Sequence, residues 1–260
     1  MTDLYEAQPH LRPIPQQRVI EKMDWYMSRR DYAGAERHLL YWLEEARMGN
    51  DLRGALMLRN ELVGHYRKTG QRDKALESGE AALELVERLD FGDTLSAATT
   101  CVNFATALSA FGEHDRALAL FQRARPIYES GPATRPELLG GLYNNMALTC
   151  AALGRFDEAQ ALYEKAVEVM ARTPRGALEV AITCLNQADL VATRDGMEAG
   201  EGAIYALADR AVALLDDPAL DHDGYYAFVC EKCVPTLEYY GYFDDARRLK
   251  EEAERIYAGA

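Results

Sequence analysis

Apolar residues recur along this chain at the spacing of one helix face. In the segment that ends at Gly112, apolar side chains follow one another at intervals of three and four residues. That spacing predicts an amphipathic α-helix. The two clearest stripes, before Gly112 and before Gly154, consist of Cys101, Phe104, Ala105 and Leu108, and of Tyr143, Met146, Ala147 and Cys150.

The helical pattern is itself repeated. Gly70, Gly112 and Gly154 follow one another at intervals of 42 residues, and Gly241 stands in a similar context. An alanine lies five residues after each glycine and another seven residues further on. These alanines are Ala75, Ala82, Ala117, Ala124, Ala159, Ala166, Ala246 and Ala253. Self-similarity at a period of this size predicts stacked helix pairs.

Each repeat predicts a helix, a tight turn and a second helix. The glycine ends the first helix in the left-handed conformation that it tolerates. An aspartate follows in the turn and is placed to cap the second helix, as Asp73, Asp115 or Asp157. The small alanines of the second helix let neighbouring helices approach closely, and Phe121 and Tyr163 fill the remaining space.

We expect one all-α domain over residues 18–257 with six helix pairs, preceded by an extended arm at 1–17 that holds Pro9, Pro13 and Pro15. Arg30 and Asp195 stand where the first and fifth pairs would have the turn glycine. Pro126 is expected to kink or shorten its helix. The expected pairs span about 18–49, 52–90, 94–130, 136–172, 177–216 and 224–257.

Two stretches, "NNMALTCAALGRFDEAQALYEKAVEVM" and "VNFATALSAFGEHDRALALFQRA", resemble the tetratricopeptide repeat. The resemblance is to its 42-residue form, found in kinesin light chain and in many bacterial scaffolds. It covers about residues 18–257 and is strongest over 52–171. It implies a right-handed superhelical solenoid whose first helices line a concave groove. Such grooves bind other protein chains or peptides.

The charge of the chain limits the classes of molecule that it is expected to bind. The formal net charge of −13 argues against nucleic acid as the main partner. Residues 12–72 carry 12 basic and 8 acidic side chains, and the remainder carries 17 and 34. This asymmetry could orient a bound chain, although a solvated acidic surface is the simpler interpretation.

The sequence also favours a cytoplasmic location. It has no apolar run near the roughly 18 residues that span a bilayer, so we expect no membrane contact. The N-terminus shows no secretory signal pattern. The five cysteines suit a compartment where thiols stay reduced.

Asparagines recur on the predicted first helices. Asn103, Asn145 and Asn186 lie nine residues before Gly112, Gly154 and Asp195, whereas Asn60 and Asn144 lie ten before Gly70 and Gly154. We expect these positions to face the groove. Because an amide side chain both donates and accepts hydrogen bonds, such a ladder can hold an extended peptide backbone. The resemblance implies the same role. The alternative is that these residues bond neighbouring helices.

Four further side chains complete the predicted peptide-binding groove. Thr106 is a small polar position in its middle, and Asp189 is an acidic one. Arg67 and Lys68 match places where carboxylate-binding members of the resembled family carry basic residues. Only one repeat supplies them, so solvated charge is the simpler interpretation.

No pattern in the chain predicts catalysis, a metal or a cofactor. Cys230 and Cys233 form a CxxC, but Cys101, Cys184 and Cys230 occupy equivalent positions on the apolar stripe, which indicates core packing. The acidic stretch from Asp216 to Gly224 lacks the glutamate that ends a calcium loop. The sequence contains no nucleophile motif and no phosphate-binding loop.

Two functions therefore remain in contention. The first is a non-catalytic scaffold that binds an extended or helical segment of a partner protein. The second is a cytoplasmic receptor for a short signalling peptide that acts by sequestering another protein. An enzyme or its regulatory subunit is a weaker third hypothesis. The N-terminal arm offers self-association as a further contact.

Overall fold

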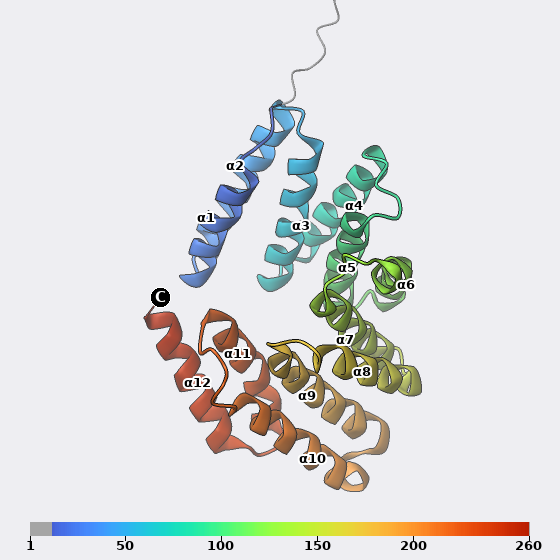
Figure 1. Ribbon diagram of the computed structural model, residues 1–260, viewed down its shortest axis with the longest axis vertical. Helices are drawn as coiled ribbons and strands as arrows, with labels where there is room; N and C mark the ends of the chain where they lie inside the picture. The colour runs from blue at the N-terminus through green and yellow to red at the C-terminus, as the bar shows by residue number, and fades with distance from the viewer. Residues whose placement is uncertain (1–11, 260) are drawn as a thin grey trace, which may run out of the picture. The chain divides into compact units, whose positions relative to one another are not determined.

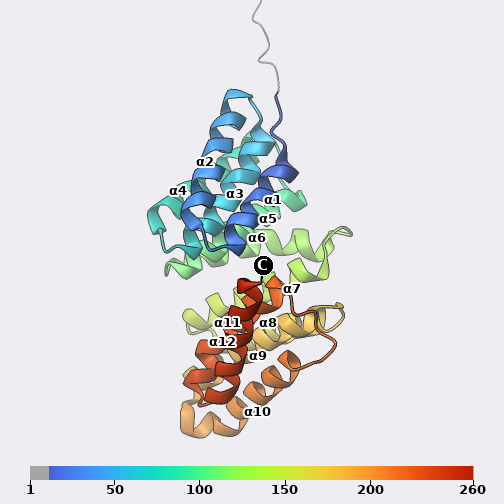
Figure 2. The ribbon, with the colours of Figure 1, turned by 90° about the vertical axis from the view of Figure 1, so that its left-hand side faces the viewer.

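The computed structural model describes residues 12–259, and these form twelve α-helices with no β-strand among them. The chain divides into two compact units, Met1–Glu113 and His114–Ala260. Within each unit, most successive helices pack antiparallel beside one another, and α11 packs against α9 and α12 (Figures 1 and 2). The predicted all-α stack of antiparallel helix pairs is confirmed.

Each unit has its own run of helices. The first unit contains α1 (Gln16–Ser28), α2 (Tyr32–Met48), α3 (Leu52–Lys68), α4 (Arg72–Arg88) and α5 (Leu95–Ala110). The second contains α6 (His114–Ser130), α7 (Pro136–Ala152), α8 (Phe156–Met170), α9 (Gly176–Asp195), α10 (Met197–Leu215), α11 (Gly224–Tyr239) and α12 (Phe243–Ala258).

The turn glycines have the conformation that the repeat predicts. Gly70, Gly112, Gly154 and Gly241 have φ angles of 71°, 82°, 73° and 86°, a region that side chains with a Cβ avoid. In the first pair, Arg30 occupies this position with φ 54°. In the fifth pair, α9 continues through Asp195 and the turn falls on Gly196.

The capping prediction was wrong, and of the two effects expected of Pro126 the shortening does not occur. Asp73, Asp115 and Asp157 do not cap their helices: each lies inside the first turn, and α4 and α8 follow Gln71 and Arg155. There the carboxylates still face the positive end of the helix dipole. Pro126 does not shorten its helix, since α6 continues to Ser130.

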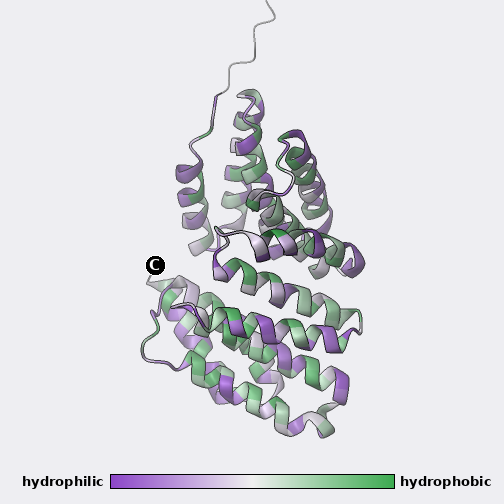
Figure 3. Cartoon of the chain, turned by 45° about the vertical axis from the view of Figure 1, so that its right-hand side comes forward, coloured by the Kyte–Doolittle hydropathy of each residue, from purple (hydrophilic) through white to green (hydrophobic). Residues whose placement is uncertain are grey.

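The repeated alanines of the second helices are buried. All eight are at most 1 % exposed, as expected of positions that face neighbouring helices. Phe121 and Tyr163 are buried beside them. One apolar cluster joins the helices of the first unit and another joins α8 to α12. Figure 3 shows apolar and polar residues on different sides of individual helices.

The predicted burial of the cysteines is confirmed. All five are buried as free thiols, and Cys184, Cys230 and Cys233 belong to the apolar cluster of the second unit. Burial raises the pKa of Cys230 to about 11 and that of Cys233 to about 12. These thiols therefore pack as small apolar groups and are protonated at neutral pH.

The end of the expected N-terminal arm is fixed to the first unit. The Arg12 amide donates to the Gly49 carbonyl at 2.8 Å, and the Ile14 amide donates to Asp51 Oδ2 at 2.9 Å. The Ile14 side chain is buried. Helix α1 begins at Gln16, so the last two residues of the expected arm are helical. Residues 1–11 of that arm lie outside the described residues.

Candidate functional site

Asn60 is fully engaged inside the first unit. Its side chain lies on α3, half-buried, and its Nδ2 donates to the Leu56 carbonyl and to Thr100 Oγ1, each at 3.0 Å. Its Oδ1 accepts a hydrogen bond of 3.1 Å from Nδ2 of Asn103 on α5. The amide of Asn60 therefore fastens two neighbouring first helices to each other.

Asn103 keeps part of its hydrogen-bonding capacity. One of its two Nδ2 protons is used by Asn60, and none of the described residues contacts its Oδ1 at hydrogen-bonding distance. The side chain is half-buried. A carbonyl oxygen and one N–H therefore remain for a guest.

The second unit contains a similar arrangement, in which the threonine donates instead of accepting. Asn144 Oδ1, on α7, accepts from Thr183 Oγ1 at 3.2 Å and from Asn186 Nδ2 at 3.0 Å, both on α9. Within the second unit's described residues, the Oδ1 of Asn186 has no hydrogen-bond donor. Each unit thus has a bonded pair of asparagines, and one member of each pair has an unused carbonyl oxygen.

The two pairs share one sequence rule, which repeat spacing alone did not disclose. The accepting asparagine lies ten residues before the turn position of its repeat, as Asn60 and Asn144. In the next repeat, Asn103 lies nine residues before Gly112 and Asn186 lies nine before Asp195, and a threonine lies twelve residues before each of these positions. These threonines are Thr100 and Thr183. Asn60 and Asn144 therefore lie one position out of line with Asn103 and Asn186 because the two sets bond to each other across neighbouring helices.

A cavity of about 660 Å³ lies beside the asparagine pair of the first unit. Asn60 and Asn103 form part of its lining, together with Glu61, and three helices contribute to it. The other lining residues are Gln16, Arg53, Leu56, Met57, Phe91, Leu95, Ser96 and Thr99. Sequence reasoning missed Gln16, which belongs to the expected arm, and Arg53 and Phe91, which no repeat position marked.

The charge in this part of the first unit is poorly compensated. Glu61 is half-buried, and burial followed by the nearby Asp24 raises the pKa of its carboxyl group. Burial also raises the pKa of Asp24. No hydrogen-bond donor within the described residues contacts either carboxylate. Arg53 lines the same cavity and faces Phe91 at 5.5 Å, so the lining includes both signs of charge.

Asp189 lies in a different cavity, of about 430 Å³, in the second unit. Its Oδ1 accepts a hydrogen bond of 2.8 Å from the Tyr240 hydroxyl, while burial raises the pKa of its carboxyl group. The cavity is otherwise lined by Ala192, Thr193, Met197, Pro235, Thr236 and Tyr239. The aromatic and methionine lining lies outside the repeat positions from which the groove was predicted.

The remaining predicted groove residues lie apart from both cavities. Arg67 and Lys68 are exposed in the last turn of α3, where cations favour the helix dipole. Lys68 Nζ lies 5.5 Å from the Tyr32 ring. Thr106 donates to the Val102 carbonyl at 2.8 Å, and the Asn145 carbonyl accepts from Thr149.

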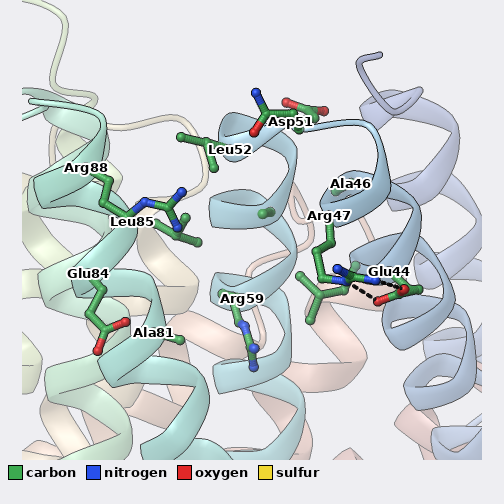
Figure 4. A pocket seen from close by; sticks show the side chains of 13 residues that line it. Glu44, Ala46, Arg47, Asp51, Leu52, Arg59, Ala81, Glu84, Leu85 and Arg88 are labelled. Carbon is green, nitrogen blue, oxygen red and sulfur yellow. Dashed lines mark hydrogen bonds and ion pairs between the residues drawn. The ribbon is translucent and has the colours of Figure 1, made fainter. Parts of the chain in front are cut away.

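A further cavity of about 460 Å³ lies between α2, α3 and α4 (Figure 4). Arg47, Arg59 and Arg88 reach it from the three helices, and Arg47 forms a two-contact ion pair with Glu44. Its lining includes three basic and three acidic residues. Charge therefore selects neither an anionic nor a cationic ligand for this cavity.

Over residues 12–259, no three histidine, cysteine, aspartate or glutamate side chains are grouped closely enough to hold a metal ion. In the same part of the chain, no helix combines the length and the apolar character needed to cross a membrane.

Comparisons with known proteins agree with the geometry. A tetratricopeptide-repeat model matches residues 55–130, and a second model of this repeat matches residues 141–169. The chain therefore carries tetratricopeptide repeats. No curated protein sequence matches it significantly.

Solved structures of the same fold include three with TM-scores above 0.5. A putative kinesin light chain from Podosopora anserina, with nearly identical TPR-like repeats, has 18% identity and a TM-score of 0.52 over 78% of this chain and 95% of that chain. A Rap protein complexed with competence and sporulation factor has 11% identity and a TM-score of 0.54 over 94% of this chain and 78% of that chain. Aspartyl phosphate phosphatase F from Bacillus subtilis has 14% identity and a TM-score of 0.53 over 93% of this chain and 68% of that chain. These similarities concern the fold alone.

Proposed function

We propose that the tetratricopeptide repeats of this chain form a non-catalytic interaction module, which binds an extended or helical segment of a partner protein. The observation that carries the proposal is the cavity of the first unit, where Asn103 presents an unused carbonyl oxygen beside the bonded Asn60. An amide in this setting bonds a peptide backbone without selecting its side chains.

The hydrogen bonds support a double role for the asparagines. Asn60 and Asn144 fasten adjacent first helices, whereas Asn103 and Asn186 are held in position by those bonds and keep a free carbonyl oxygen. A guest then meets an amide whose orientation is already fixed, which lowers the entropy cost of binding. We also propose a cytoplasmic location, because all five cysteines are free thiols.

The test begins with affinity capture from native cytosol, followed by measurement of the captured partner's affinity in purified form. We expect Asn103→Ala to weaken binding about tenfold, the size expected for one well-made hydrogen bond in a desolvated site. Gln122→Ala is the matched control, because it truncates an exposed amide on a second helix. Both variants should be compared below their melting temperatures.

A partner that binds wild type and Asn103→Ala with equal affinity would contradict the groove proposal and place the interface on another face. The Asn103→Ala variant also loses its bond to Asn60, which should cost about 1 kcal/mol of stability. Melting curves therefore separate a loss of fold from a loss of contact.

The second candidate function is a receptor for a short signalling peptide that acts by sequestering another protein. The likeness to a Rap protein complexed with competence and sporulation factor motivates this candidate through the fold alone. A free oligopeptide that binds only the native state would raise the melting temperature by mass action. A peptide pool that leaves the melting temperature unchanged while a folded protein is captured would favour the scaffold.

A further inference from the structure

The cavity around Asp189 has an unusual combination of side chains. It places one carboxylate among Tyr239, Tyr240, Met197 and Pro235. Tyr239 is 69% exposed and Met197 is 45% exposed. Large apolar side chains left in solvent around a single charge are more typical of a binding surface than of a structural ion pair.

Asp189 has one protein partner and capacity for more. Its Oδ1 accepts from the Tyr240 hydroxyl at 2.8 Å, and its Oδ2 meets no donor among the described residues. Tyr240 is buried and so fixes the direction of the carboxylate. Burial raises the pKa of the Asp189 carboxyl group, with no cation contributing to lower it. No cation among the described residues pairs with this carboxylate, so its ionised form is left uncompensated within the second unit.

Two other aromatic residues of α11 each have a cationic side chain over their ring. Arg175 lies 5.4 Å from the Tyr225 ring and Lys232 lies 4.9 Å from the Phe228 ring. The ring of Tyr239 packs edge-on against Tyr240 at 5.1 Å, and no cation within the described residues covers it. An open aromatic face next to an uncompensated carboxylate is the arrangement that attracts a guanidinium or ammonium group.

The geometry points to a binding subsite at Asp189 for a basic side chain, with arginine favoured over lysine, belonging to a peptide segment bound by this chain. The guanidinium group would donate to Asp189 Oδ2, which meets no donor among the described residues, and stack on the Tyr239 ring, which no cation of those residues covers. This inference rests on the proposed interaction function and specifies the chemistry of its partner. The second unit, with 15 basic and 24 acidic side chains, adds a long-range attraction for such a segment.

The test uses Nα-acetyl-arginine amide as the probe and the citrulline analogue, which has the same shape but no charge, as its comparison. Binding to the full chain is followed by NMR chemical-shift changes. We expect the arginine probe to bind about tenfold more tightly than the citrulline probe, and Asp189→Asn to remove most of that difference. Tyr239→Ala should weaken the arginine probe about threefold.

Asp221→Asn is the matched control, because it removes the same charge from an exposed loop carboxylate of the same unit. It should leave both affinities unchanged. Equal binding of the two probes, no detectable binding of either, or an Asp189→Asn variant that binds like wild type would overturn the subsite. These outcomes are independent of the Asn103 test in the first unit, so failure of the subsite is distinguishable from failure of the proposed interaction function.

Discussion

His65 is the residue whose setting departs most from ordinary packing. It is 2% exposed on α3, and neither ring nitrogen has a hydrogen-bond partner among residues 12–259. Its neighbours are Tyr32 and Tyr66, whose ring centroids lie 6.5 and 5.4 Å away. Burial is the main cause that lowers the pKa of His65, and the charge of Glu36 opposes it while that of Lys74 reinforces it. Burial therefore favours the neutral ring of His65, whose two nitrogens give up the hydrogen bonds that they would make to water.

Replacing His65 by leucine should stabilise the first unit. The variant removes two unsatisfied buried nitrogens at similar volume, so we expect about 1 kcal/mol of added stability at pH 8. The gain should grow on acidification. Because the folded pKa lies below the unfolded one, wild type loses stability as pH falls below about 6.5, and the variant lacks that loss. Urea unfolding at pH 8 and 5.5 measures both effects, and a parallel pH response in the two proteins would contradict them.

At the residue scale, the repeat in the sequence predicted which positions are equivalent. It did not predict the hydrogen bonds that join one repeat to the next. The offset of nine residues placed Asn103 and Asn186 on equivalent positions, which both use to donate to an asparagine of the preceding repeat. The bonding itself was not predictable, because it depends on how far one helix is shifted along the next. The Asp189 cavity was missed for the same reason, since Tyr239 and Met197 come from different helices.

At the scale of the element, the alanine positions set the spacing between helices. The sequence predicted them well because the same small residue recurs at a fixed place in every repeat. Helix ends were harder: the aspartates expected as caps lie one or two residues inside α4 and α8. A residue that favours a cap also favours the first turn, so its type does not determine its exact place.

Ala159→Leu should strongly destabilise the chain. Ala159 on α8 is fully buried, and three extra carbons there force neighbouring helices apart, at a cost of about 1–3 kcal/mol. Ala161→Leu is the control, because Ala161 is exposed on the same helix. Thermal melting of both variants measures the difference. Equal melting temperatures would show that the contact at Ala159 adapts to a larger side chain.

Asp51 joins two elements through one carboxylate. Its Oδ1 accepts from the Gly54 amide at the start of α3, and its Oδ2 accepts from the Ile14 amide, both at 2.9 Å. Asp51→Ala should therefore cost about 1–2 kcal/mol and expose residues 12–15 to proteases. Asp31 caps α2 through Gly34 without such a link, so Asp31→Ala should lose stability without added cleavage near Ile14. Limited proteolysis with mass spectrometry compares the two.

At the scale of the whole molecule, the reactivity of the buried thiols can be used to measure the unfolding of each unit. Cys101 lies in the first unit, and Cys150, Cys184, Cys230 and Cys233 lie in the second. Burial raises the pKa of the four thiols of the second unit and keeps all five out of reach of reagents.

We therefore expect slow labelling by an aromatic disulfide reagent in native buffer, and labelling that follows unfolding as urea is added. Mass spectrometry of the labelled peptides shows which unit opens first. Rapid labelling of any of the five thiols in native buffer would contradict their burial.

The asparagine bonds also have a consequence for repeat shuffling in protein design. Because each of these hydrogen bonds joins an asparagine of one pair to a threonine or an asparagine of the next, the bonding determines which pair can follow which. The pair containing Asn60 needs a successor with threonine and asparagine at the positions of Thr100 and Asn103, and the pair containing Thr183 and Asn186 offers the same two residues. The pair containing Asn145 offers Leu142 in place of that threonine. A recombined chain should accept the first of these successors more readily than the second.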